Sequence, residues 1–87
     1  MLSETVDLRI GVIRASGHLT VQGADLLRGT ADSLREGGHR RVVLDLAGVQ
    51  GADDDGLDVL RSLRADFASD GGELVLQDVG RLGSEAG

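Results

Sequence analysis

The chain has 87 residues, no cysteine and a net charge of −6, and all nine of its basic residues are arginine. This length is typical of one small domain, and the absence of cysteine excludes disulfides, thiolate chemistry and zinc sites built on sulfur. Nucleic acid is excluded as an expected partner because there is no basic stripe and Phe67 is the only aromatic residue, which leaves neither a phosphate-neutralising face nor a stacking platform.

The first half of the chain predicts two strands and a helix. Leu2–Ser16 alternates apolar and polar residues in two bursts, which indicates strands joined by a turn near Asp7 or Gly11, and Gly17 is expected to end the second strand. Thr20–Glu36 has helical periodicity, with its threonine as the expected cap and a Gly-Gly pair after its end. One face of this helix carries the apolar residues Ala24, Leu27, Ala31 and Leu34.

The second half predicts a strand, a helix and a further strand. Arg41–Leu46 is β-branched and nearly continuous in apolar residues, a pattern typical of a strand covered on both faces of a parallel sheet. We expect a loop over residues 47–52 and a second helix from about Asp54 to Ala68. Its apolar stripe consists of Leu57, Leu60, Leu63 and Phe67. A second Gly-Gly pair ends this helix, and Glu73–Gln77 predicts the last strand.

The order of these elements predicts a small α/β domain, β-β-α-β-α-β. Strands that alternate with helices favour right-handed crossovers, so we expect a mixed, mostly parallel sheet of about four strands with two main helices. Residues 1–87 then form a single domain, whose polar, glycine-rich tail over 78–87 is predicted to be disordered. No element follows to cover Glu73–Gln77, and an uncovered apolar strand favours a homodimer or a docked protein partner.

Four carboxylates, those of Asp53, Asp54, Asp55 and Asp58, lie where the buried strand leads into the second helix. Acids in the first turn are favoured by the helix dipole, so helix capping alone is one explanation. However, Asp54 and Asp58 are four residues apart and repel each other, which pure capping does not require. The alternatives are a switch surface that faces a protein partner and a site for Mg²⁺ or Ca²⁺, although the segment lacks the alternating spacing of a calcium loop.

Other polar residues give little sign of catalysis. Asp45 lies in an apolar strand and is expected to be a hydrogen-bonded structural residue. His18 and His39 are expected in loops, with no second ligand at a metal-binding spacing. No serine lies in a nucleophile motif, and a chain without lysine has no phosphate-binding Walker loop. We therefore expect a protein that is not an enzyme and has no metal or cofactor.

Membrane and export signals are also missing from the sequence. No apolar run is long enough to cross a bilayer, and the N-terminus lacks the charged-then-apolar pattern of a signal peptide. We therefore expect a cytoplasmic protein without direct membrane insertion.

Two motifs, in order and at matching spacing, resemble those of the STAS domain, which is shared by anti-sigma factor antagonists and the cytoplasmic tails of sulfate transporters. Gly17-His18-Leu19-Thr20 resembles the Gly-Glu-Leu-Asp step before the first helix of that family. Asp53-Asp54-Asp55-Gly56-Leu57 resembles its Asp-Ser-Ser-Gly-Leu loop. The resemblance covers about residues 12–77. Members of that family normally continue after the last strand with another helix and often a fifth strand, but residues 78–87 are too short and too polar for both, so this helix is expected to be missing.

The resemblance implies a non-catalytic regulator that binds a protein, in most antagonists an anti-sigma factor that is also a serine kinase. Asp55 stands where those antagonists carry the phosphorylated serine, and aspartate has no hydroxyl to accept a phosphate. It either mimics phosphoserine permanently or marks a domain outside the kinase circuit. The alternative is an accessory subunit that docks on the ATPase of an ABC-type transporter. The implied partner surface consists of Gly17, His18, Leu19, Thr20, the 47–52 segment, Asp53, Asp54, Asp55, Gly56, Leu57 and Asp58.

Overall fold

The structure is a computed structural model that describes residues 2–78. The tail predicted to be disordered therefore lies outside the described residues, apart from Asp78. The elements follow the predicted order, β-β-α-β-α-β, and are β1 (Leu2–Asp7), β2 (Val12–Leu19), α1 (Val21–Glu36), β3 (Arg41–Ala52), α2 (Asp54–Ser69) and β4 (Glu73–Gln77).

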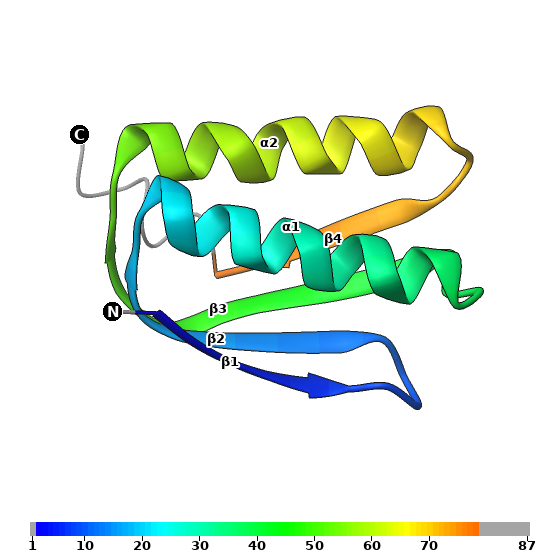
Figure 1. The fold of residues 1–87 in the computed structure, drawn as a ribbon, viewed down its shortest axis with the longest axis horizontal. Helices are drawn as coiled ribbons and strands as arrows, with labels where there is room; N and C mark the ends of the chain where they lie inside the picture. The colour runs from blue at the N-terminus through cyan, green and yellow to red at the C-terminus, as the bar shows by residue number, and fades with distance from the viewer. Residues whose placement is uncertain (1, 79–87) are drawn as a thin grey trace.

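The four strands form one mixed sheet in the order β1-β2-β3-β4. β1 runs antiparallel to β2, whereas β2, β3 and β4 are mutually parallel because a helix connects each to the next. Both helices lie on the same face of the sheet and begin at the same end of it (Figure 1). The predicted fold class, a small α/β domain with a mixed, mostly parallel sheet and two main helices, is confirmed.

The core fills the space between the helix layer and the sheet. All four apolar residues of the predicted α1 face and all four of the α2 stripe are buried. From the sheet, the fully buried large side chains are Ile13, Leu19, Val42, Leu44 and Leu46. Because each helix presents one apolar stripe to one sheet face, the fold is a two-layer arrangement.

The prediction that Arg41–Leu46 is covered on both faces is wrong. Along this part of β3 burial alternates, with Val42, Leu44 and Leu46 buried and Val43 and Asp45 half-buried. No element of residues 2–78 packs on the second face, so the residues that point there keep contact with water. Asp45 is hydrogen-bonded as expected, since its Oδ1 accepts from the backbone N–H of Ala47 at 2.9 Å.

The second and third strands are longer than predicted. β2 continues past Gly17 to Leu19, and β3 continues through the segment 47–52 that was expected to be a loop. Two register shifts let the two strands stay paired, so that Leu19 lies opposite Ala52. Gly17, with φ of 99°, lies at one of these irregularities rather than at the strand end.

The turn between β1 and β2 also differs in detail from the apolar pattern. Leu8 and Ile10 continue the alternation in the sequence, but they lie in the turn and are 69% and 62% exposed. The turn is closed by a hydrogen bond from Gly11 N to Asp7 O at 3.0 Å. Gly11 has φ of 68°, a conformation that glycine adopts without strain. The turn therefore runs from Asp7 to Gly11, the two residues near which it was predicted.

Arg35 joins the C-terminal ends of the two helices. Its guanidinium lies 4.8 Å from the centroid of the Phe67 ring and 2.9 Å from the Asp32 carboxylate. A longer contact, 3.9 Å, reaches Asp70 just after α2. The N-terminal ends are joined differently, and that end of the molecule carries the candidate site.

Candidate partner-binding site

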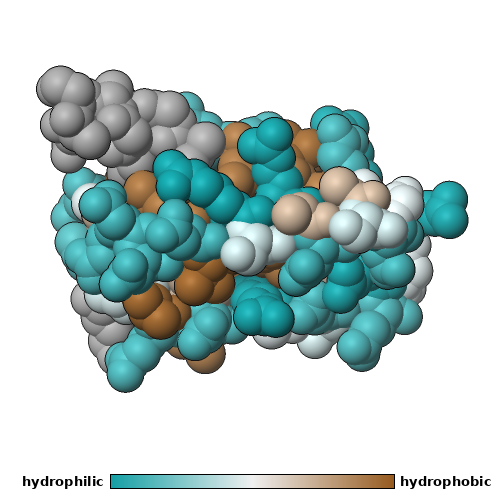
Figure 2. All heavy atoms as spheres, turned by 90° about the horizontal axis from the view of Figure 1, so that it is seen from above, coloured by the Kyte–Doolittle hydropathy of each residue, from teal (hydrophilic) through white to brown (hydrophobic). Residues whose placement is uncertain are grey.

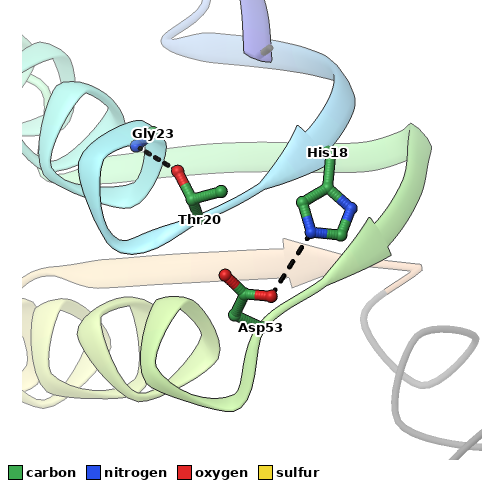
Figure 3. A network of polar contacts seen from close by, with 4 residues as sticks. All are labelled: His18, Thr20, Gly23 and Asp53. Atoms are coloured by element: carbon green, nitrogen blue, oxygen red, sulfur yellow. Dashed lines mark hydrogen bonds and ion pairs between the residues drawn. The ribbon is translucent and has the colours of Figure 1, made fainter.

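The candidate site is formed where β2 leads into α1 and β3 leads into α2, at the end of the sheet where both helices begin (Figure 1). The two connections are tied together by a hydrogen bond from Asp53 N to Leu19 O at 2.9 Å. Thr20, between β2 and α1, caps α1 as predicted, since its hydroxyl oxygen accepts from Gly23 N at 3.2 Å (Figure 3). The backbone of the site is therefore held in place by the fold.

Gly56, in the first turn of α2, lies directly against the first connection. A Cβ at this position would lie 3.1 Å from both the carbonyl carbon and the oxygen of Thr20, and 3.3 Å from the oxygen of Leu19. These are backbone atoms, which cannot rotate out of the way. The glycine in the acidic motif therefore allows the N-terminus of α2 to approach the β2–α1 connection closely.

Asp53 occupies the N-cap position of α2 but its side chain makes no cap hydrogen bond. Its Oδ1 instead lies 3.3 Å from Nε2 of His18 at the end of β2 (Figure 3). Both side chains are about half exposed, at 56% and 51%. His18 packs over Gly51, where a Cβ would come within 3.1 Å of its Nδ1. The first carboxylate of the motif thus faces outward to a histidine rather than inward to the helix.

The next two acids, Asp54 and Asp55, form the first turn of α2 and are exposed. Asp58, one turn later, is paired with Arg61, three residues further along the helix, at 3.0 Å. The free negative charge at this end is therefore concentrated on Asp53–Asp55, close to the positive end of the α2 dipole. Such a surface can accept hydrogen bonds and attract a cationic partner group.

The structure brings most of the predicted site residues to one end of the molecule but does not expose them all. The exposed residues are His18, Asp53, Asp54, Asp55 and Asp58, and the half-buried ones are Gly17 and Thr20. Leu19, predicted as part of the partner surface, is fully buried and is unavailable to a partner. Gly56 and Leu57 are buried as well, so they shape the surface from beneath.

Two features of the site were not predicted from the sequence. His18 lies in β2 rather than in a loop, because β2 runs two residues beyond Gly17. Val21, the first residue of α1, is 40% exposed at the same end of the molecule. The exposure of Val21 could have been inferred from the sequence, because this apolar residue lies off the helix face formed by Ala24, Leu27, Ala31 and Leu34.

Two further observations on the described residues concern metal sites and membrane spans. Within residues 2–78, no three His, Asp or Glu side chains are placed to hold a metal ion together. None of the helices in that range is both long and apolar enough to span a bilayer.

Comparisons with known proteins assign this chain to a known class, that of STAS domains. Residues 4–85 match the family described as "Mlab, STAS domain", and the chain belongs to this family. STAS domains are typically non-catalytic regulators. No curated protein sequence matches the chain.

Two solved structures share the fold. The crystal structure of Mglu matches with a TM-score of 0.68 and 27% sequence identity, over 77% of this chain and 17% of the Mglu chain. This chain thus corresponds to about a sixth of Mglu. The anti-sigma factor antagonist SpoIIAA in its unphosphorylated form matches with a TM-score of 0.64 over 87% of this chain and 71% of its own. At 10% identity, the second likeness concerns the fold alone.

Proposed function

We propose that this chain is a protein-binding regulator whose partner surface is the acidic start of α2 together with His18. In this proposal Asp55 stands at the phosphoacceptor position of an anti-sigma factor antagonist and supplies a permanent negative charge. One carboxylate carries about one charge, against 1.5 to 2 for a phosphoserine, so the mimicry is partial. The partner is an ATPase-fold protein of the anti-sigma type.

The observation that carries the proposal is the position of the Asp53 side chain. If the acidic motif served only to cap α2, Asp53 would accept a hydrogen bond from the first turn, as Thr20 does in α1. The carboxylate is instead turned toward His18, and Asp54 and Asp55 add further exposed charge without an ion pair to any described residue. Concentrated charge of this kind favours recognition by a complementary surface.

A second candidate function is that of an accessory subunit docked on a transporter ATPase. It is favoured by the absence of a hydroxyl at both Asp54 and Asp55, since a subunit that stays bound needs no kinase-operated switch. Both candidates use the same end of the molecule, and they differ in the identity and permanence of the partner.

Affinity capture from the host organism separates the two candidates. The wild-type chain is compared with Asp55→Ser and with Asp66→Ser, which removes the same charge from an exposed position at the other end of α2. We expect the wild type and Asp66→Ser to retain one ATPase-fold protein that Asp55→Ser retains differently. An anti-sigma kinase supports the first candidate and a transporter ATPase the second. If all three chains retain every captured protein equally, the acidic motif does not take part in partner binding, and both candidate functions are contradicted on that point.

A further inference from the structure

The outer edge of β4 is an unoccupied pairing site within the described chain. β4 is hydrogen-bonded to β3 along one side, and no strand of residues 2–78 pairs with its other side. Beside this edge, a hollow of about 290 Å³ is lined by β4 and by Arg64 and Ala68 of α2. Figure 2, which looks down on the helix layer, shows apolar surface on the side of α2 where β4 lies. An exposed edge with apolar side chains is a template for another strand.

The opposite edge of the sheet has a different character. β1 reads Leu-Ser-Glu-Thr-Val-Asp, so polar residues interrupt its apolar ones and two carboxylates lie along it. β4 reads Glu-Leu-Val-Leu-Gln, with three consecutive apolar residues at its centre. Charged side chains on an edge strand oppose pairing with other chains. Of the two edges, β4 is therefore the one suited to receive a strand.

We propose that the occupant of this edge is β4 of a second copy, paired antiparallel with Val75 on the two-fold axis. In this register Leu74 lies opposite Leu76 of the second copy, and Glu73 lies opposite Gln77 of the second copy. Apolar residues thus meet apolar ones at the three central positions, and no like charges are directly opposite. The two four-stranded sheets become one continuous sheet, with the helices of both copies on the same face.

Self-pairing of β1 lacks this complementarity. With Glu4 on the two-fold axis, two carboxylates would lie opposite each other, and with Thr5 on the axis Glu4 would lie opposite Val6. Like charges directly opposite destabilise an antiparallel pair. The sequence of β4 is therefore what selects a symmetric partner at that edge.

Charge makes this association weak and dependent on salt. Each copy carries a net charge of −6, so two copies repel each other. The strand contributes five residues, so the interface is small and its dimer reversible. Because salt screens this repulsion, dimerisation strengthens as ionic strength rises.

Single-cysteine crosslinking tests the register directly, because the chain has no cysteine of its own. Residues directly opposite in antiparallel strands have Cβ atoms about 4.5–5.5 Å apart, close to the separation a disulfide needs. We expect Val75→Cys to form a disulfide-linked dimer under mild oxidation. Thr5→Cys, at the centre of β1, is the matched control and should stay mostly monomeric. Equal crosslinking of both variants, or none at Val75→Cys, overturns the proposal.

Sedimentation velocity of the cysteine-free chain gives a second, independent readout at about 100 μM, where exposed edges associate. We expect a concentration-dependent dimer that strengthens as salt is added. Val75→Lys should abolish it while circular dichroism shows the native fold. A wild-type chain that remains monomeric at high salt overturns the proposal. Asp55→Ser should leave the dimer unchanged, which keeps this test separate from that of the acidic motif.

Discussion

Replacing Gly56 by alanine tests whether the close approach at the start of α2 holds the site together. In an unobstructed helix this substitution stabilises by about 1 kcal/mol, since alanine is the better helix former. At Gly56 the added Cβ would lie 3.1 Å from two backbone atoms of Thr20 and 3.3 Å from the oxygen of Leu19. Relief of this overlap requires a shift of the helix, and such overpacking costs about 1–3 kcal/mol. We therefore expect a net loss of stability.

Gly29→Ala is the matched control, because Gly29 lies in α1 and a Cβ there meets no atom within 4 Å. Urea denaturation of both variants should show opposite signs, with Gly29→Ala more stable than wild type and Gly56→Ala less stable. For a domain of this size, each kcal/mol corresponds to about 4–8 °C in Tm. If Gly56→Ala is as stable as Gly29→Ala, the two connections are not packed as closely as described and the reasoning fails.

Three further substitutions or treatments have defined outcomes. Thr20→Ala should cost about 1 kcal/mol of stability because it removes a cap hydrogen bond. Asp53→Ala removes no cap hydrogen bond and should change stability by less than about 0.5 kcal/mol in the same urea melts. Equal losses of stability in the two variants would mean that the Asp53 side chain does cap α2. Arg35→Ala should cost about 1–2 kcal/mol of stability because it removes the contacts with Phe67 and Asp32. Arg28 is an exposed arginine of the same helix, and Arg28→Ala should leave the stability nearly unchanged in thermal melting. Incubation with ATP and an anti-sigma-type serine kinase should leave Asp55 without phosphate, and a stable adduct on Asp53–Asp55 in intact and peptide mass spectra would contradict this.

The helices and the strand order could be predicted from the sequence because local signals agree with the tertiary structure. Thr20 and the Gly-Gly pairs mark helix ends, and the two apolar stripes both face the core. The extension of β3 through residues 47–52 could not be predicted, because Ala-Gly-Val-Gln-Gly-Ala has little strand propensity of its own. Its strand conformation depends on pairing with β2, which is a long-range contact.

Burial of the second sheet face was wrongly predicted for a related reason. The apolar run of Arg41–Leu46 indicated cover on both faces, yet valine at position 43 is compatible with a half-buried position. In the candidate site, the motif Asp53–Leu57 was located correctly at the start of α2. The contact between His18 and Asp53 depends on the same β2–β3 pairing, so no sequence spacing reveals it.

The most direct test of the central claim is to titrate Asp55→Ser against the ATPase-fold partner recovered by affinity capture, beside wild type and Asp66→Ser. Loss of the dipole interaction, offset by reduced repulsion from Asp54 and Asp58, should keep the stability change of Asp55→Ser below about 1 kcal/mol. The partner surface account predicts at least a tenfold change in Kd for Asp55→Ser, about 1.4 kcal/mol, and an unchanged Kd for Asp66→Ser. If Asp55→Ser is clearly less stable but binds with the wild-type Kd, the acidic motif serves only the helix and the account is wrong.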